Sequence, residues 1–316
     1  MPRLLITRPL PEKVIAAAKS KFDVDVRPSN AVLTDDEKRV ALTEYDAVLP
    51  TLGDAFSAEF FTQDMRCKLL ANFGVGFNHI DATAARAVGI EVTNTPGAVT
   101  DATADIAMTL MLMTCRRAGQ GERMVRAGHW EGWHPTQLLG MHLSGKTLGV
   151  VGMGRIGQAI AKRAALGFGM EVVFYNRSKL SDLPFKARQL DTLEEVLATA
   201  DVVVLAVPAT PQTRHLINRG TIASMRPHSY LVNIARGDII EEAALIDALK
   251  NQQIAGAGLD VYEFEPQVPQ ALCDMENVTL LPHLGTAAQE VREEMGMMAV
   301  ANLIAFFEGK PVPNPV

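Results

Sequence analysis

A glycine-rich turn in the middle of the chain constrains the fold most. It is the sequence Val150-Val151-Gly152-Met153-Gly154-Arg155-Ile156-Gly157, which follows an apolar run and precedes a stretch with helical spacing. In such a turn Gly152 permits the tight reversal, Gly154 leaves room for a pyrophosphate, and Gly157 lets the helix pack closely on the strand. The N-terminus of the helix then faces the phosphate charge. The pattern predicts a dinucleotide site in which Arg155 and Ile156 also contact the cofactor, whereas the glycine spacing alone also occurs in turns that serve only packing.

The end of the next predicted strand indicates which dinucleotide binds. Residues 171–175 form an apolar run that ends in Asn176, Arg177 and Ser178. This is about 20 residues after the glycines, where sites specific for NAD place an acidic residue on the ribose. No carboxylate stands there, and the guanidinium of Arg177 suits a 2′-phosphate. We therefore expect NADPH to be preferred over NADH; the alternative is an arginine on a solvated turn.

Length and charge narrow the class of protein. A chain of 316 residues with 48% hydrophobic content suits two domains, each with its own core. A net charge of −6 offers no basic surface for nucleic acid. The most apolar helical stretch, residues 104–115, is too short to cross a membrane. Cys67, Cys115 and Cys273 have no metal-ligand spacing, so we expect buried thiols in a reducing cytoplasm and no metal site.

Short apolar runs alternate with helical stretches before the glycine turn. The predicted strands are residues 4–6, 24–26, 47–49, 69–73 and 91–93. This alternation is typical of a parallel sheet covered on both faces. The segment 94–101 contains Pro96-Gly97 and predicts a linker that opens a long helix over residues 102–116, whose Met and Leu side chains we expect in the core.

The alternation resumes after the glycine turn and predicts six strands, the number of a complete dinucleotide-binding sheet. They are residues 148–151, 172–175, 202–207, 230–234, 257–260 and 279–281. A last helical stretch, residues 287–307, either caps this second domain or crosses back to the first. If it crosses back, the cleft between the domains becomes the expected site.

Ligands of such sheets bind beyond the carboxyl ends of the strands, so the residues there are the candidates for chemistry. Arg236 has the planar fork that holds a carboxylate or a 2-keto acid, and His283 could protonate a carbonyl oxygen during reduction by a nicotinamide. A carboxylate that orients the histidine would favour its charged form. Glu265 is the best candidate, with Glu263 and Asp260 as alternatives. A surface ion pair for the arginine and a packing role for the histidine remain possible alternatives.

Taken together, six stretches resemble the D-2-hydroxyacid dehydrogenase family, and within it most resemble the NADPH-dependent glyoxylate/hydroxypyruvate reductases. They cover nearly the whole chain in the family's order: Asn72-Phe73-Gly74-Val75-Gly76-Phe77-Asn78-His79-Ile80-Asp81, Asn94-Thr95-Pro96-Gly97, residues 148–157, Val232-Asn233-Ile234-Ala235-Arg236-Gly237, residues 258–266, and Leu281-Pro282-His283-Leu284-Gly285.

The resemblance implies a Rossmann-type doubly wound cofactor domain over residues 99–286 and a flavodoxin-like α/β substrate domain over residues 1–98 and 287–316, with a cleft between them. It also implies that Arg236, Glu265 and His283 are catalytic. Substrate contacts are expected from Leu52, the backbone of Val75 and Gly76, Arg236 and His283. The expected cofactor contacts are Gly152, Gly154, Arg155, Ile156, Gly157, Asn176, Arg177, Ser178, Pro208, Thr213, Ala235, Asp260 and Gly285.

Both tryptophans, Trp130 and Trp133, lie in one stretch that lacks helical spacing. Such clustered aromatic surface indicates a partner contact, and similar reductases are dimers, so we expect a homodimer through the cofactor domain.

Several functions remain open at this point. Glyoxylate and hydroxypyruvate are the expected substrates, with pyruvate, 2-ketogluconate or phosphite as alternatives. The resemblance disfavours formate as the substrate, because the similar enzymes that oxidise formate have an amide side chain at the position of Glu265. A regulator that senses the nucleotide on the same fold is an alternative of a different class.

Overall fold

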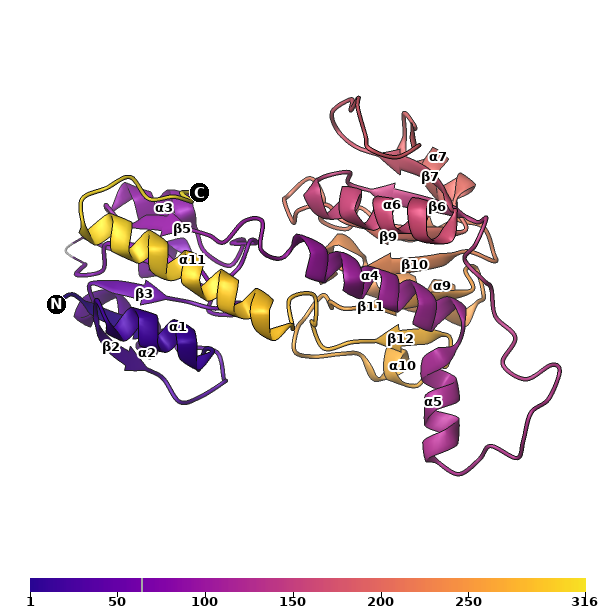
Figure 1. Cartoon of the computed structure of the whole chain (residues 1–316), viewed down its shortest axis with the longest axis horizontal. Helices are drawn as coiled ribbons and strands as arrows, with labels where there is room; N and C mark the ends of the chain where they lie inside the picture. Colours follow the sequence, from indigo (N-terminus) through magenta and orange to yellow (C-terminus); the bar gives the residue numbers. More distant parts are fainter. Residues whose placement is uncertain (64) are drawn as a thin grey trace. The chain divides into compact units, whose positions relative to one another are not determined.

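The computed structural model describes residues 1–63 and 65–316, and the chain divides into two compact units. Unit 1 comprises residues 1–99 and 286–316, and unit 2 comprises residues 100–285 (Figure 1). The last helix, α11 (Gln289–Phe307), therefore belongs to unit 1 although it follows unit 2 along the chain. The division falls within one residue of the limits expected from the sequence.

Unit 1 is built on a parallel sheet, as the alternating pattern predicts. Its strands are β1 (Arg3–Ile6), β2 (Asp23–Val26), β3 (Ala47–Leu49), β4 (Leu69–Ala71) and β5 (Glu91–Thr93). In the described part of the unit these strands lie in the order β2-β1-β3-β4-β5, and each pairs in parallel with its neighbours. This is the flavodoxin-like order, which confirms the expected fold class.

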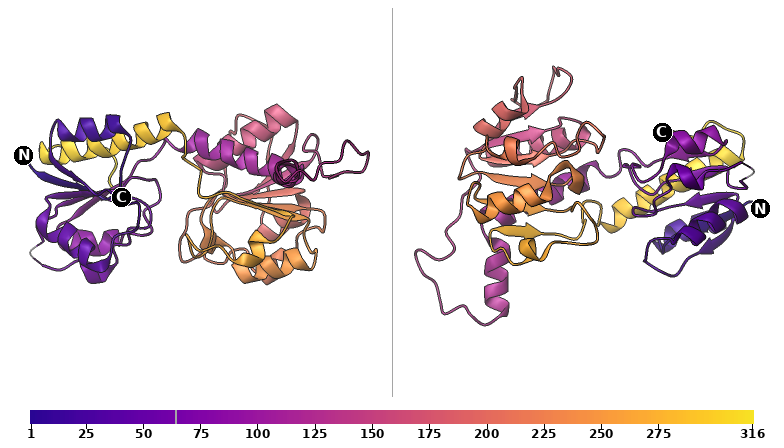
Figure 2. Two further views of the ribbon diagram at one scale, coloured as in Figure 1. Left: turned by 90° about the horizontal axis from the view of Figure 1, so that it is seen from below. Right: turned by 180° about the vertical axis from the view of Figure 1, so that it is seen from behind.

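Helices cover both faces of this sheet (Figure 2). They are α1 (Glu12–Lys19), α2 (Asp35–Glu44), α3 (Ala82–Ala87) and α11, with a short 3-10 helix over Ala58–Phe60. α1 and α11 pack on one face, and α2 and α3 on the other. α11 lies so close to α1 that a Cβ on Gly296 would lie within 2.4 Å of Val14 Cγ2. The absence of a side chain there allows the two helices to pack together.

Unit 2, whose residues are all described, contains a parallel sheet of seven strands rather than the expected six. They are β6 (Thr147–Val151), β7 (Glu171–Tyr175), β8 (Arg188–Gln189), β9 (Val202–Leu205), β10 (Tyr230–Asn233), β11 (Gly256–Leu259) and β12 (Val278–Leu280). The order β12-β11-β10-β9-β6-β7-β8 is that of a doubly wound dinucleotide-binding sheet with one added strand. The missed strand is β8, because two polar residues at a sheet edge have no apolar run.

Two groups of helices cover this sheet. The helices of unit 2 are α4 (Thr100–Cys115), α5 (Ala118–Arg126), α6 (Arg155–Phe168), α7 (Leu193–Thr199), α8 (Arg219–Ile222), α9 (Glu242–Lys250) and α10 (Gln270–Cys273), with a 3-10 helix over Gly237–Ile239. α4 and α6 pack on one face, and α7 to α10 pack on the other (Figure 2). The expected core role of α4 is confirmed, whereas α5 has no buried residue.

The three cysteines do not share one environment. Cys67 and Cys115 are buried, and burial raises the pKa of each thiol to about 12. Cys273 is exposed, so the expectation of burial was wrong there. It is the last residue of the one-turn helix α10, in which only Leu272 is buried.

Across the part of the chain that the structure describes, no helix combines the length and apolarity needed to span a membrane.

Candidate active site

The three glycines of the central turn have different structural reasons to be glycine. Gly152 has a φ of +96°, and a Cβ there would lie 2.7 Å from Val207 Cγ1. A Cβ on Gly157 would overlap the carbonyl oxygen of Gly152. A Cβ on Gly154, by contrast, would meet no atom within 4 Å. The packing of the chain therefore explains two of the glycines, whereas the third leaves open backbone that fits an approaching pyrophosphate.

The turn is held to the end of β7. Asn176 Oδ1 accepts a hydrogen bond from Met153 N at 3.1 Å, and Asn176 Nδ2 donates to Ser178 Oγ at 3.1 Å. α6 begins with no side chain capping its first N–H groups, which leaves them available to an anion. Arg177 is exposed and makes no hydrogen bond or ion pair with another residue that the structure describes. A cation is thus available beside the glycine turn.

Arg236 follows β10 in a loop that Asn233 organises. Asn233 Nδ2 donates to Arg236 O at 2.8 Å, and Asn233 Oδ1 accepts from Ala235 N at 3.0 Å. The guanidinium donates from Nη1 to Ala235 O at 2.7 Å, but its buried Nε has no partner among the described residues. Burial lowers the pKa of Arg236, and the charges of Glu265 and Asp238 oppose this effect. A buried donor without a partner is costly, so this arginine is suited to an anionic ligand. The role of Asn233 was not predicted from the sequence, in which an amide inside an apolar strand was the available signal.

His283 and Glu265 form a hydrogen-bonded pair. His283 Nδ1 lies 2.8 Å from Glu265 Oε2, and Glu265 Oε1 accepts from Tyr262 N at 3.0 Å. Burial alone would raise the pKa of Glu265, but the hydrogen bond and charge of His283, with the Tyr262 N–H, outweigh it and lower that pKa. Glu263, an alternative partner in the sequence analysis, bonds to His215 instead.

Asp260, the other alternative, shapes the turn that bears the histidine. Its two carboxylate oxygens accept from Leu284 N at 2.6 Å and from Gly285 N at 2.8 Å. His283 itself has a φ of +54°, a left-handed conformation that these bonds help to hold. Burial raises the pKa of Asp260, and the Leu284 N–H acts against this. Its expected contact with the cofactor stays a prediction, since the structure shows the carboxylate buried against backbone amides.

The remaining expected cofactor residues lie at the carboxyl ends of the same sheet. Thr213 Oγ1 donates to Pro208 O at 2.7 Å and accepts from Thr210 N at 2.8 Å, which orders the loop after β9. Ala235 follows β10 and Gly285 follows β12. Because neighbouring strands are parallel, these loops share the edge at which His283, Glu265 and Arg236 also lie.

In unit 1, the loop after β4 presents backbone amides. Asn72 Nδ2 donates to two carbonyls of this loop, including Gly76 O at 3.0 Å, and Asn94 Nδ2 donates to Val75 O at 2.9 Å. The N–H groups of Val75 and Gly76 donate to no other described residue. Leu52 is 37% exposed in the turn after β3. The loop can therefore bind an anion through amides whose carbonyls are already held in place.

Comparisons with known proteins identify the family. The family described as "D-isomer specific 2-hydroxyacid dehydrogenase, NAD binding domain" matches residues 108–285. Glyoxylate reductase from Thermococcus kodakarensis is 42% identical over 320 residues, which is 100% of this chain and 96% of the relative. The chain belongs to the D-isomer specific 2-hydroxyacid dehydrogenase family.

Other relatives agree with this family. Glycerate dehydrogenase from Hyphomicrobium methylovorum is 39% identical over 97% of this chain and 96% of its own length. The crystal structure of an NADPH-dependent glyoxylate/hydroxypyruvate reductase from Sinorhizobium meliloti, in complex with NADP and malonate, superposes with a TM-score of 0.85. It is 34% identical and covers 100% of this chain and 96% of that one. This D-2-hydroxyacid dehydrogenase is thus an oxidoreductase whose NAD-binding domain lies in unit 2.

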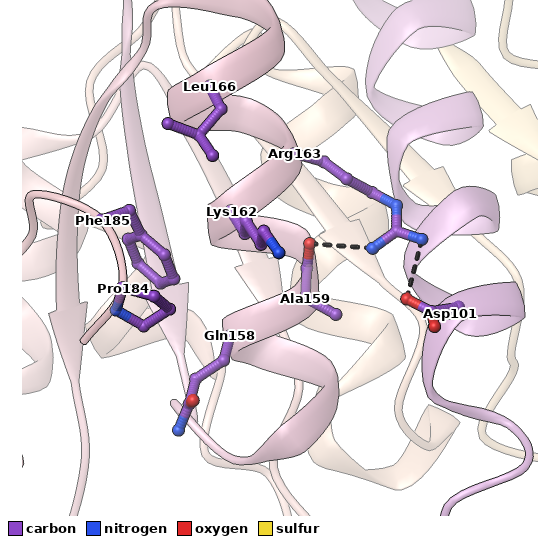
Figure 3. A pocket seen from close by; sticks show the side chains of 8 residues that line it. All are labelled: Asp101, Gln158, Ala159, Lys162, Arg163, Leu166, Pro184 and Phe185. Atoms are coloured by element: carbon purple, nitrogen blue, oxygen red, sulfur yellow. Dashed lines mark hydrogen bonds and ion pairs between the residues drawn. The ribbon is translucent and has the colours of Figure 1, made fainter. Parts of the chain in front are cut away.

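One pocket in unit 2 of the dehydrogenase is lined by other residues. It is bordered by α6, the start of α4, and Pro184 and Phe185 (Figure 3). Arg163, its most prominent cation, donates to Asp101 at 2.9 Å and to Ala159 O at 3.1 Å. None of the expected site residues lines it. The charge of Arg163 is therefore satisfied within the chain, by Asp101 and Asp105.

Proposed function

We propose that this dehydrogenase uses NADPH to reduce a small 2-keto acid, glyoxylate or hydroxypyruvate, to the D-2-hydroxy acid. The observation that supports this most directly is the His283–Glu265 pair, 2.8 Å apart, at the sheet edge where Arg236 keeps an unpartnered buried Nε. A proton donor and a cation for an oxoanion are the groups that carbonyl reduction requires. The names of the glyoxylate reductase and glycerate dehydrogenase relatives support the substrate class.

The cofactor would be held by the glycine turn and the loops beside it. The amides at the start of α6 and the open backbone at Gly154 would bind the pyrophosphate, and Arg177 would bind the 2′-phosphate that distinguishes NADPH. When bound, the nicotinamide supplies the hydride. The relative that binds NADP supports a preference for NADPH over NADH.

The residues of the chain would bind and protonate the substrate. The N–H groups of Val75 and Gly76 bind its carboxylate, and Arg236 binds the carboxylate and carbonyl oxygens through its planar fork. His283 donates a proton to the carbonyl oxygen as that oxygen gains negative charge. Glu265 orients the imidazole and stabilises its charged form before the transfer.

A substrate panel tests the proposed function. The purified protein is supplied with NADPH and glyoxylate, hydroxypyruvate, pyruvate or 2-ketogluconate, and loss of NADPH absorbance is followed. The first two should give the highest kcat/KM. Reduction of NADP by phosphite or formate without keto acid turnover would favour the other dehydrogenase reactions, and NADPH binding without any turnover would favour a sensor.

The role of His283 has its own test. His283→Ala should lower kcat by about 100-fold or more, since positioned general acids contribute about that much. Its Kd for NADPH should stay close to that of the unchanged protein, measured by fluorescence titration. His228→Ala removes another histidine paired with a carboxylate, Asp201, and should keep its turnover. Full turnover in His283→Ala would remove this residue from the chemistry.

We also propose a homodimer through the segment that includes α5 and the tryptophans. α5 has no buried residue, and Val125, Trp130, Trp133 and Leu139 are 60%, 54%, 79% and 66% exposed. In Figure 1, α5 and the chain after it project from the rest of unit 2. A second copy would cover this apolar surface.

The location of the protein in a reducing cytoplasm stays a prediction.

A further inference from the structure

A second histidine–carboxylate pair lies near the candidate active site and has no role in the proposed chemistry. His215 Nε2 lies 2.7 Å from Glu263 Oε1, and their side chains are 33% and 10% exposed. His215 belongs to the loop after β9, and Glu263 belongs to the loop after β11, two residues before Glu265. The pair therefore joins two loops that are distant in sequence.

Glu263 also reaches the segment after β10. Glu263 Oε2 accepts from Glu242 N at 3.2 Å, and Glu242 Oε2 accepts from Glu263 N at 3.3 Å. Glu242 is the first residue of α9, and Glu241 before it provides no side-chain cap. The carboxylate of Glu263 thus serves as the missing cap, in a position that the helix dipole favours. Burial raises the pKa of Glu242; the hydrogen bond from Glu263 N opposes this, and the charge of Glu263 adds to it.

Backbone contacts connect this cluster to the proposed catalytic residues. His215 N donates to Asp238 O at 2.8 Å, two residues after Arg236. A Cβ on Gly237 would overlap the backbone of Tyr262, so the two loops touch at that point. The N–H of Tyr262 in turn holds Glu265. A displacement of Glu263 would therefore shift both the loop that bears Arg236 and the loop that bears Glu265.

We propose that the His215–Glu263 pair is a positioning device that joins the loops after β9, β10 and β11. It would thereby hold Arg236 and Glu265 in place relative to the loop after β9. This inference rests on the proposed function for its effect on turnover. The physical connection among the loops can be tested without substrate.

Three variants separate positioning from general stability. His215→Ala removes the contact, and His215→Gln keeps an N–H donor on a side chain of similar reach. His228→Ala is the matched control, because His228 Nε2 lies 2.9 Å from Asp201 Oδ1 at the amino ends of β9 and β10, the opposite edge of the sheet. His215→Ala should lower kcat/KM for the keto acid about tenfold, through kcat more than KM, as expected for misplaced catalytic groups. His215→Gln should restore most of the loss, and His228→Ala should show none.

Hydrogen–deuterium exchange supplies a readout that needs no substrate. The amide of Tyr262 should exchange about tenfold faster in His215→Ala than in the unchanged protein or in His228→Ala, because the loop opens more often. Equal exchange and equal kcat/KM in His215→Ala would overturn the inference, as would the same losses in His228→Ala. An unchanged protein that reduces no keto acid would instead defeat the proposed function, while the exchange result would still decide whether the pair locks the loops.

Discussion

Three carboxylates close to the end of β11 have similar chemistry and different partners. Glu265 bonds to His283, Glu263 bonds to His215, and Asp260 accepts two backbone amides. Burial would raise the pKa of Glu265, but the hydrogen bond and charge of His283 outweigh it and lower that pKa, whereas burial raises the pKa of the more enclosed Asp260. Only a carboxylate that stays ionised can stabilise a charged imidazole, so the environment favours Glu265 for this task.

Glu265→Gln should change the pH dependence of reduction. Glu265 is ionised above its lowered pKa, so at neutral pH it carries the charge that the proposed mechanism uses to stabilise charged His283. An amide cannot do so, and the alkaline decline of kcat/KM should therefore begin at lower pH in the variant. Glu194→Gln removes an exposed carboxylate from α7 and should leave the profile as it was. A coincident profile for Glu265→Gln would point to another group as the partner of the histidine.

Arg177→Asp should reverse the cofactor preference. The change replaces an exposed, unpaired cation at the end of β7 by a carboxylate, which repels the 2′-phosphate and can bind a ribose hydroxyl. kcat/KM for NADPH should fall and that for NADH should rise relative to the unchanged protein. Lys250→Asp, at the end of α9, alters net charge equally and should not affect the ratio. A ratio that still favours NADPH in Arg177→Asp would defeat the assignment.

At the scale of elements, the strand–turn–helix of β6 and α6 combines packing and binding in a few residues. Gly152 and Gly157 are required by contacts within the turn, whereas Gly154 faces open space. Gly167, further along α6, also has no atom within 4 Å of an added Cβ. The same substitution at these positions therefore separates stability from binding.

Gly154→Ala should weaken NADPH binding about tenfold or more while the melting temperature stays nearly unchanged, because the added methyl group meets only the ligand. Gly157→Ala should lower the free energy of unfolding, by about 1–3 kcal/mol for an overpacked site. Gly167→Ala should stabilise α6 by up to about 1 kcal/mol and keep the affinity. Calorimetric melting and fluorescence titration give both quantities. Unaltered affinity in Gly154→Ala would show that the pyrophosphate binds elsewhere.

At the scale of the molecule, the chain forms two units, each built on a parallel sheet with its own strand order. Unit 1 offers amides to an anion, and unit 2 offers the cofactor turn and the His283–Glu265 pair. α11 completes the core of unit 1 from the far end of the chain. The exposed tryptophans of unit 2 are outside both cores, and this predicts that assembly involves them.

Trp130→Ser with Trp133→Ser should convert a dimer to monomers. Removing two large aromatic side chains from an interface lowers the favourable free energy of association more than most other pairs of substitutions, since such residues dominate binding energy. Sedimentation equilibrium of the unchanged protein and of the double variant measures the change in mass. Leu166→Ser, at an exposed site on α6, is the control and should keep the mass of the unchanged protein. A monomeric unchanged protein would contradict the proposed homodimer.

The sequence by itself determined the two parallel sheets and the glycine turn, because apolar runs alternating with helices and glycines at fixed spacing express local requirements of the backbone. It also placed Arg236 and His283 at strand ends, although their roles remain proposals. The sequence favoured Glu265 as the partner of His283, but only the tertiary structure decided among the three carboxylates. It alone showed that Glu263 faces His215 and that β8 joins the sheet edge. Pairings of this kind depend on the paths of loops between distant strands, which the packing of the whole unit sets and no local pattern encodes.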